Sequence, residues 1–123
     1  MSFASIRIIT DDVDRLVAFY ERVTGQTATR PAPVFAQFDG LGATLAIASP
    51  ATVAMLGDAV IPAANRSVIV EFEVEDVDAE FARLAADPSE IVLPPSTMPW
   101  GNRSALLRDP DGNVVNLFSR PRA

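Results

Sequence analysis

The chain has 123 residues, of which 49% are hydrophobic, a formal net charge of −6, and no histidine or cysteine. This length is typical of one domain with a sizeable core. The missing residue types exclude histidine-based metal sites, Ser-His-Asp triads, cysteine nucleophiles and disulfides. The acidic charge argues against nucleic acid and anionic membranes as partners, and it is compatible with a neutral or cationic small molecule.

The sequence contains no apolar stretch approaching the roughly 20 residues that a membrane span needs. The first residues, Met1 to Arg7, lack the basic and then apolar regions of a signal peptide. We therefore expect a cytoplasmic protein that does not contact a membrane.

The first half of the chain predicts a strand, a helix and three further strands. Residues 3–10 form the first strand, whose alternation places Ser5 and Arg7 on one face. Asp11 or Asp12 caps the helix that follows, and Gly25 ends it because glycine tolerates a left-handed cap. The apolar stripe of this helix comprises Val13, Leu16, Val17, Tyr20 and Val23. Further strands are expected near 26–30, 34–39 and 42–48.

The second half repeats this order. Residues 67–74 predict a strand with one fully apolar face, while Ile69, Glu71 and Glu73 lie on the other. Asp76 caps a helix that runs to about Ala86. A short strand over 90–93 is expected to end before Pro94-Pro95. The last hairpin joins strands 103–108 and 113–119 through the turn Asp109-Pro110-Asp111-Gly112.

The repeat is also visible in the letters of the sequence. Asp11-Asp12-Val13-Asp14 matches Glu75-Asp76-Val77-Asp78, which lies 64 positions later (75 minus 11). We therefore predict a single domain over 1–123 with two modules. The modules are expected at 1–48 and 67–120, and the linker at 49–66, with a short helical turn near 52–56. Each module is a four-stranded sheet with a helix on one face.

Three series of residues, spread over nearly the whole chain, carry a family resemblance. They are Asp12-Val13 with Phe19-Tyr20 and Gly25, the run from Phe72 to Asp78, and Trp100-Gly101 followed by 109–113. Together with the repeat, they resemble the vicinal oxygen chelate superfamily, which includes glyoxalase I, extradiol dioxygenases and the fosfomycin- and bleomycin-resistance proteins. The resemblance implies an α+β fold, in which two βαβββ modules form a curved mixed sheet cleft, and a homodimer.

Metal-dependent members of that superfamily bind a divalent ion through residues on particular strands. Counted from the matched motifs, three ligand positions fall on Ser5, Ile69 and Asn116, and the fourth lies on strand 42–48, which has no Asp, Glu or His. Isoleucine cannot bind a metal, and neutral serine and asparagine are poor ligands. We therefore expect no metal and no cofactor. A weaker alternative is a hard-ion site built from Glu71 and Glu73.

Glu71 and Glu73 are the candidate catalytic or ligand-binding residues. They are suited to accept a cationic ligand, or to act as a general base if burial raises the pKa of a carboxyl group. Arg7 occupies in the first module the place that Glu71 has in the second, 64 positions apart (71 minus 7). The alternative interpretation is an Arg7–Glu71 ion pair or a solvated sheet face.

Several other side chains are candidates for the walls of the site. Trp100 is the only tryptophan, and its loop suggests either a stacking wall or a plug at the end of the sheet. Asn116 is either a ligand partner or a partner for Ser5 or water. Arg103 and Arg108 suit a carboxylate or phosphate, or simply balance surface charge. The predicted ligand-binding set is Ser5, Arg7, Phe35, Ile69, Glu71, Glu73, Trp100, Asn116 and Phe118; Phe38 is a further apolar candidate.

These features lead to three hypotheses about function. The first is a metal-independent protein that binds a small molecule and sequesters an antibiotic or a hydrophobic or cationic metabolite. The second is a metal-free lyase or isomerase acting beside a carbonyl, with Glu71 or Glu73 as the base. The third is a vestigial or regulatory module that binds another protein. The sequence does not identify the ligand.

Overall fold

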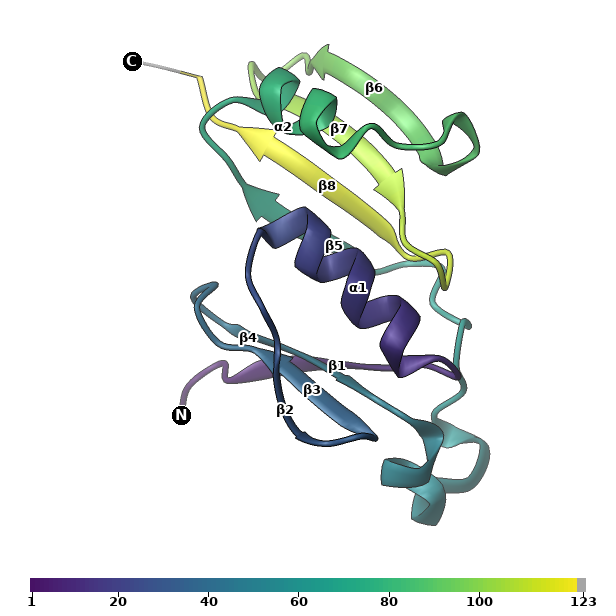
Figure 1. Ribbon diagram of the computed structural model, residues 1–123. Helices are drawn as coiled ribbons and strands as arrows, with labels where there is room; N and C mark the ends of the chain where they lie inside the picture. Colours follow the sequence, from purple (N-terminus) through teal and green to yellow (C-terminus); the bar gives the residue numbers. More distant parts are fainter. Residues whose placement is uncertain (122–123) are drawn as a thin grey trace. The chain divides into compact units, whose positions relative to one another are not determined.

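A computed structural model describes residues 1–121, which fall into two compact units that meet between Ala64 and Asn65: unit 1 precedes this boundary and unit 2 follows it. Each unit runs strand, helix, then three strands (Figure 1). Unit 1 consists of β1 (Ser5–Ile9), α1 (Val13–Thr24), β2 (Thr29–Ala32), β3 (Phe35–Phe38), β4 (Thr44–Ala48) and the 3-10 segment η1 (Pro50–Ala59). Unit 2 consists of β5 (Ile69–Glu73), α2 (Val77–Leu84), η2 (Pro88–Glu90), β6 (Ile91–Thr97), β7 (Arg103–Arg108) and β8 (Val114–Ser119).

The two sheets have the same topology. Their strand orders are β1-β4-β3-β2 and β5-β8-β7-β6. In each sheet the first strand is parallel to the last, and the other neighbours are antiparallel. The pairing is equivalent too, because Arg7 lies opposite Ala46 in unit 1 as Glu71 lies opposite Asn116 in unit 2. Two mixed four-stranded sheets, each with its helix, confirm the predicted α+β class.

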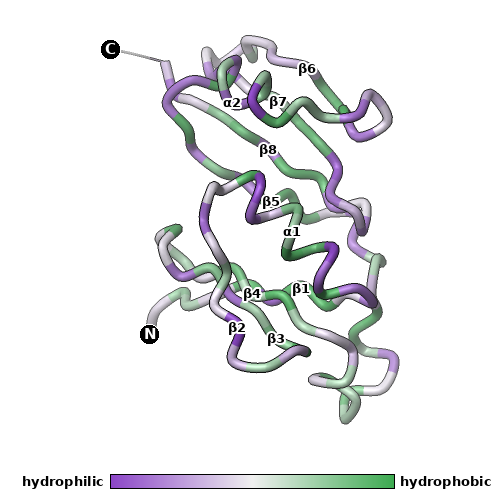
Figure 2. The backbone as a smooth tube through the Cα atoms, in the orientation of Figure 1, coloured by the Kyte–Doolittle hydropathy of each residue, from purple (hydrophilic) through white to green (hydrophobic). Residues whose placement is uncertain are grey.

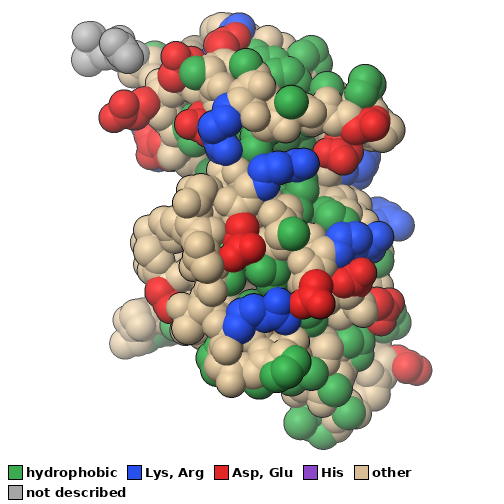
Figure 3. Space-filling model, viewed as in Figure 1, with side chains coloured by type: hydrophobic (Ala, Val, Ile, Leu, Met, Phe, Trp, Pro, Cys, Tyr) green, Lys and Arg blue, Asp and Glu red, His purple; other side chains and the backbone are tan. Residues whose placement is uncertain are grey.

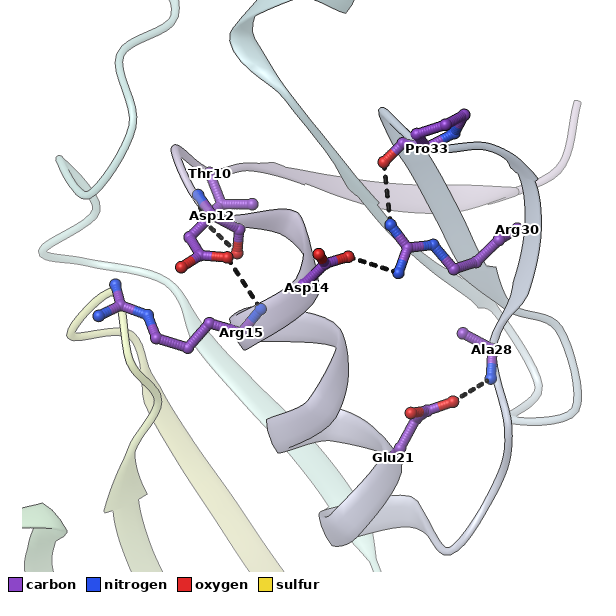
Figure 4. Close-up of polar contacts among 8 residues, drawn as sticks. All are labelled: Thr10, Asp12, Asp14, Arg15, Glu21, Ala28, Arg30 and Pro33. Atoms are coloured by element: carbon purple, nitrogen blue, oxygen red, sulfur yellow. Dashed lines mark hydrogen bonds and ion pairs between the residues drawn. The ribbon is translucent and has the colours of Figure 1, made fainter.

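Both α-helices begin with the same cap. Asp12 Oδ1 accepts a hydrogen bond of 3.0 Å from the backbone N–H of Arg15 (Figure 4), and Asp76 Oδ1 accepts one of 3.0 Å from Ala79. Each carboxylate satisfies a backbone donor that the first helical turn leaves unpaired. At the other end of α1, Gly25 has φ 70°, the left-handed conformation expected of it.

One face of each sheet is buried beneath its own helix. Figure 2 shows α1 alternating between hydrophilic and hydrophobic segments, as an amphipathic helix must. Its apolar stripe is buried as predicted and also includes Phe19. In unit 2, α2 packs against β7 and β8. The buried side chains of that layer are Val77, Leu84, Ala105, Leu107, Val115 and Leu117.

Exposed polar contacts attach the loop after α1 to the helix (Figure 4). Arg30 donates from Nη1 to Asp14 Oδ1 at 2.7 Å and from Nη2 to the carbonyl of Pro33 at 2.9 Å. Glu21 Oε2 accepts from the backbone of Ala28 at 2.9 Å. Figure 3 shows basic and acidic side chains next to one another on this face. Exposed pairs of this kind contribute little each, about 0–1 kcal/mol.

The two strands that contain prolines differ from the predicted bounds. β2 covers Thr29–Ala32 rather than 26–30 and includes Pro31, and β6 continues through Pro94 and Pro95 instead of ending before them. Both are edge strands, where a missing backbone N–H need not break a ladder on both sides. Their pairing shifts register at the irregular positions. The helical part of the linker also extends further than expected: η1 covers Pro50–Ala59, but it is kinked, and Val53 and Gly57 within it have non-helical backbone angles.

No helix within residues 1–121 combines the length and the apolar character that crossing a membrane requires.

A buried polar network fixes the turn between β7 and β8. Asp109, 4% exposed, accepts hydrogen bonds at Oδ1 from the backbone N–H groups of Asp111 and Asn113, both at 2.9 Å. Its Oδ2 accepts from Asn113 Nδ2 at 2.7 Å. Asn65 donates to Asn113 Oδ1 at 3.1 Å, which ties the start of unit 2 to this turn. The sequence Asp109-Pro110-Asp111-Gly112 therefore acts in turn formation, as expected.

We predict that Asp109→Ala lowers the free energy of unfolding by about 2–3 kcal/mol, because buried donors lose their acceptor. Urea denaturation followed by circular dichroism measures the loss. Asp11→Ala removes an exposed aspartate and serves as the matched control, with a change of about 0.5 kcal/mol or less. Equal losses in the two variants would contradict a structural role for the network.

Arg103 and Asp78 form a two-point ion pair between β7 and α2. Arg103 Nη2 lies 2.8 Å from Asp78 Oδ1, and its Nε lies 3.0 Å from Oδ2. The hydrogen bonds from Arg103 hold the pKa of Asp78 below its ordinary value of 3.8. Of the two roles considered for Arg103, the structure shows the charge-balancing one.

This pair predicts a pH-dependent stability. The folded-state pKa of Asp78 is depressed, so its stabilisation is complete above the ordinary pKa and is lost as the pH falls through the folded-state value. Asp78→Asn is expected to lower Tm at neutral pH, and its difference from the natural chain is expected to shrink below about pH 3.8. Thermal melts of both proteins between pH 2 and 7 measure this, and a pH-independent difference would refute it.

Candidate functional site

The candidate site is the face of the second sheet that points away from α2, which we call the distal face of unit 2. Alternation along β5 turns Glu71 away from the side of α2, and pairing places Asn116 beside it. The neighbouring pairs are Ile69 with Val114 and Glu73 with Phe118. From β7, Ser104, Leu106 and Arg108 face the same way, since they pair with Phe118, Asn116 and Val114. This sheet face thus carries two exposed carboxylates and four apolar side chains, together with the polar Ser104 and Asn116 and the cationic Arg108.

Glu71 and Asn116 form the central polar contact of this face. Asn116 Nδ2 donates to Glu71 Oε2 at 2.8 Å. The amide oxygen, Oδ1, is buried and has no hydrogen-bond partner among the described residues. An unpaired buried acceptor costs free energy, so this oxygen is ready to accept an N–H or O–H from a ligand. Glu71 is thus a partner of Asn116 that the sequence analysis did not name.

Glu73 lies at the end of β5 and pairs with a residue that the sequence analysis did not single out. Arg120 Nε approaches Glu73 Oε2 at 3.1 Å, and the Arg120 guanidinium lies 5.8 Å from the centre of the Phe118 ring. Both charged side chains are more than half exposed, so the ion pair is weak. A shallow depression of about 460 Å³ opens here, lined by Glu73, Val74, Glu75, Ser119 and Arg120.

The corresponding face of unit 1 carries Ser5 and Arg7, both exposed. Within the described part of unit 1, the side chain of Arg7 makes no hydrogen bond or ion pair. Phe35 shares this face but is half-buried, because it packs against the small cluster of Ile9, Ala48 and Val53. Phe35 therefore contributes to packing at one end of the face, and the Arg7–Glu71 ion pair stays a prediction.

Two of the proposed aromatic wall residues lie elsewhere. Trp100 sits in the turn between β6 and β7 and is 69% exposed, so it does not pack into the unit 2 core. The turn itself is tight: Gly101 has φ 99°, and a Cβ there would lie 2.9 Å from Pro121 Cγ. Phe38 is 1% exposed and belongs to the side of the sheet that α1 covers, like Tyr20. Phe118 alone of the three phenylalanine candidates lies on the distal face of unit 2.

The residues at the expected metal positions do not fit a divalent ion. Three positions hold Ser5, Ile69 and Asn116, and the strand register places Ala46 at the fourth, opposite Arg7. None supplies a charged oxygen, an imidazole or a thiolate. Across residues 1–121, no cluster of three or more acidic, histidine or cysteine side chains is arranged for a metal ion. The alternative hard-ion site at Glu71 and Glu73 lacks a third acidic partner in that part of the chain.

Comparison with known proteins agrees with this fold. The model of the Glyoxalase/Bleomycin resistance protein/Dioxygenase superfamily matches residues 2–117. The proposed glyoxylase CFP32, from Mycobacterium tuberculosis and Mycobacterium bovis, is 29% identical over 111 residues, which is 90% of this chain but only 41% of that protein. The chain thus spans less than half the length of these curated relatives.

Two solved structures illustrate the structural likeness. A glyoxalase/bleomycin resistance protein/dioxygenase from Nocardioides has a TM-score of 0.78 and 26% identity, over 100% of this chain and 85% of that one. A family enzyme from Burkholderia phytofirmans PsJN has a TM-score of 0.81 over 97% of this chain and 98% of that one. At 18% identity, the second comparison concerns the fold alone.

The side chains at the expected metal positions predict that the chain binds no divalent ion. After treatment with a chelator, Zn²⁺, Ni²⁺, Mn²⁺ and Fe²⁺ are expected to leave Tm unchanged, because a ligand that binds only the folded state would raise it. Differential scanning fluorimetry and elemental analysis after dialysis measure this. One tightly held ion per chain would overturn the assignment, and its loss in the Glu71→Gln, Glu73→Gln double variant would locate the ion at the carboxylates.

Proposed function

The chain belongs to the Glyoxalase/Bleomycin resistance protein/Dioxygenase superfamily, and from that membership we propose that it is a metal-independent binding protein for small molecules that combine a cationic group with apolar surface. One observation supports this most directly: Glu71 and Glu73 stand exposed beside four apolar side chains of the same sheet face. The apolar side chains around them are Ile69, Leu106, Val114 and Phe118.

Each polar group of this face has a distinct role in the proposal. Glu71 accepts the cation, and its carboxylate is held in place by the amide of Asn116. The unpaired Asn116 Oδ1 accepts a second donor from the ligand. Glu73 supplies further negative charge, because its exposed contact with Arg120 is weak enough for a ligand cation to replace.

The net charge of −6 supports capture of a cation, since it favours the approach of positively charged molecules. The superfamily name includes bleomycin resistance, which makes bleomycin a reasonable antibiotic probe.

A homodimer is part of this proposal, and sedimentation velocity tests it. Sequestration requires no proton transfer, so the absence of histidine from the chain is no obstacle.

The sharpest test compares two probes of nearly equal shape, cationic benzamidine and neutral benzamide. Isothermal titration calorimetry is expected to show that the chain prefers benzamidine by about tenfold, equivalent to about 1.4 kcal/mol. The Glu71→Gln, Glu73→Gln double variant keeps the side-chain shapes and is expected to lose this preference. Metal-free bleomycin is then titrated into the same proteins.

The matched control is Glu80→Gln, which removes an acidic charge from unit 2 on α2, where Glu80 pairs with Arg83 at 2.6 Å. This variant is expected to retain the preference for benzamidine. If the natural chain binds neither benzamidine nor bleomycin, or if all three proteins bind them equally, the proposal fails.

A second candidate function is that of a metal-free lyase or isomerase, in which Glu71 acts as the base. The hydrogen bond from Asn116 occupies Oε2 and leaves Oε1 to abstract a proton beside a carbonyl. Deuterium uptake from D₂O into a panel of ketones, followed by NMR, tests this reaction. Glu71→Gln is expected to abolish uptake and Glu80→Gln to preserve it. Uptake that persists in Glu71→Gln would exclude this base.

A further inference from the structure

A second pocket of unit 2 has the opposite electrostatic character. It has a volume of about 270 Å³ and lies where β5 and β8 begin. Its lining comprises Asn65, Arg66, Ser67, Val68, Ile69, Arg108, Gly112 and Val114. Two arginines and no carboxylate line this pocket, although acidic residues outnumber basic ones by 16 to 10 in the whole chain.

Arg108 is the key residue of this pocket. Four other arginines each pair with a carboxylate: Arg30 with Asp14, Arg83 with Glu80, Arg103 with Asp78, and Arg120 with Glu73. Within residues 1–121, the side chain of Arg108 instead makes a single hydrogen bond, from Nη1 to the carbonyl of Gly112 at 3.2 Å. That bond anchors the guanidinium and leaves Nε and Nη2 as donors, the pair that binds a carboxylate or phosphate at two points.

The neighbouring acid does not neutralise Arg108. Asp109 is almost fully buried and uses both carboxylate oxygens to accept three hydrogen bonds inside the turn. The Asp109 carboxylate is thus engaged within the turn, while the side chain of Arg108 lies on the distal face beside Val114.

The opposite wall of the pocket is held in place before any ligand binds. Asn65 Oδ1 accepts from the backbone N–H groups of Ser67 and Val68 at 3.1 and 2.9 Å, and its Nδ2 donates to the Val68 carbonyl at 2.9 Å. Arg66 therefore lies in a loop that these hydrogen bonds hold in one conformation. Its Nη1 also donates to the Asn65 carbonyl at 3.1 Å. A preorganised loop loses less conformational freedom on binding.

We propose that this pocket binds the anionic group, a carboxylate or a phosphate, of a small molecule. Arg108 supplies the two-point contact, Arg66 a second positive charge and the Ser67 hydroxyl a neutral donor. Ile69 and Val114 give the pocket an apolar floor, which suits a short aliphatic or aromatic group attached to the anion. This site does not depend on the proposed capture of cations at Glu71 and Glu73.

The test is a ¹⁵N-NMR titration of the full chain with inorganic phosphate and, separately, with benzoate, at constant ionic strength. Saturable shifts are expected in the amides of residues 66–69 and 112–114. Arg108→Gln is expected to weaken binding by at least about tenfold, because it removes a charge-assisted two-point contact. Tighter binding of phosphate identifies a phosphate site, and tighter binding of benzoate a carboxylate site.

Arg83→Gln is the matched control, because it removes the same charge from unit 2 at a place already paired with Glu80. The affinity of this variant for phosphate is expected to stay within about twofold of that of the natural chain, because dissolved salt screens the long-range effect of losing one surface charge. If Arg108→Gln does not fold by thermal melt, Arg66→Gln replaces it with the same expected direction. The proposal would be overturned if neither phosphate nor benzoate caused saturable shifts. It would also be overturned if the pocket variant, Arg108→Gln or Arg66→Gln, bound these anions as tightly as the control Arg83→Gln.

Discussion

Burial of one sheet face under one helix is the constraint on which the rest of this structure depends. Val115 and Leu117 must lie beneath α2, so alternation forces Asn116 to the other side. The parallel pairing of β5 with β8 then brings Glu71 directly beside Asn116. A shift of one residue in that register would exchange the two faces, burying the carboxylate and exposing the core. The same alternation that stabilises the fold therefore positions the candidate site.

Local patterns in the sequence predicted the helices and the repeat closely, because their causes are local. Asp12 and Asp76 cap helices by bonding a backbone N–H three residues ahead, and Gly25 adopts its left-handed conformation without help from distant residues. The continuation of β6 through Pro94-Pro95 was not predictable in this way. Proline is tolerated there because β6 lies at an edge of the sheet. Which strand lies at an edge depends on the order of all four strands, and a local sequence pattern does not contain that order.

The site shows the same division between local and long-range information. Alternation was sufficient to place Glu71 and Glu73 together on one face, but the hydrogen bond from Asn116 depends on a pairing between residues 45 positions apart. Phe35 and Phe38 look alike in sequence, yet one packs against a small cluster and the other lies beneath α1. Arg108 stands out because four other arginines, Arg30, Arg83, Arg103 and Arg120, have carboxylate partners and it does not, a contrast that no local sequence pattern reveals.

The two edges of each sheet are not equivalent, and the prolines decide the difference. β2 and β6 lie at one edge of their sheets and carry Pro31 and Pro94-Pro95, which remove donors and interrupt the regular ladder. β1 and β5, at the opposite edges, contain no proline. A polypeptide that extends either sheet by backbone pairing would therefore meet a regular row of donors and acceptors only along β1 or β5. Aggregation by strand addition and strand exchange are thus favoured at one edge of each sheet.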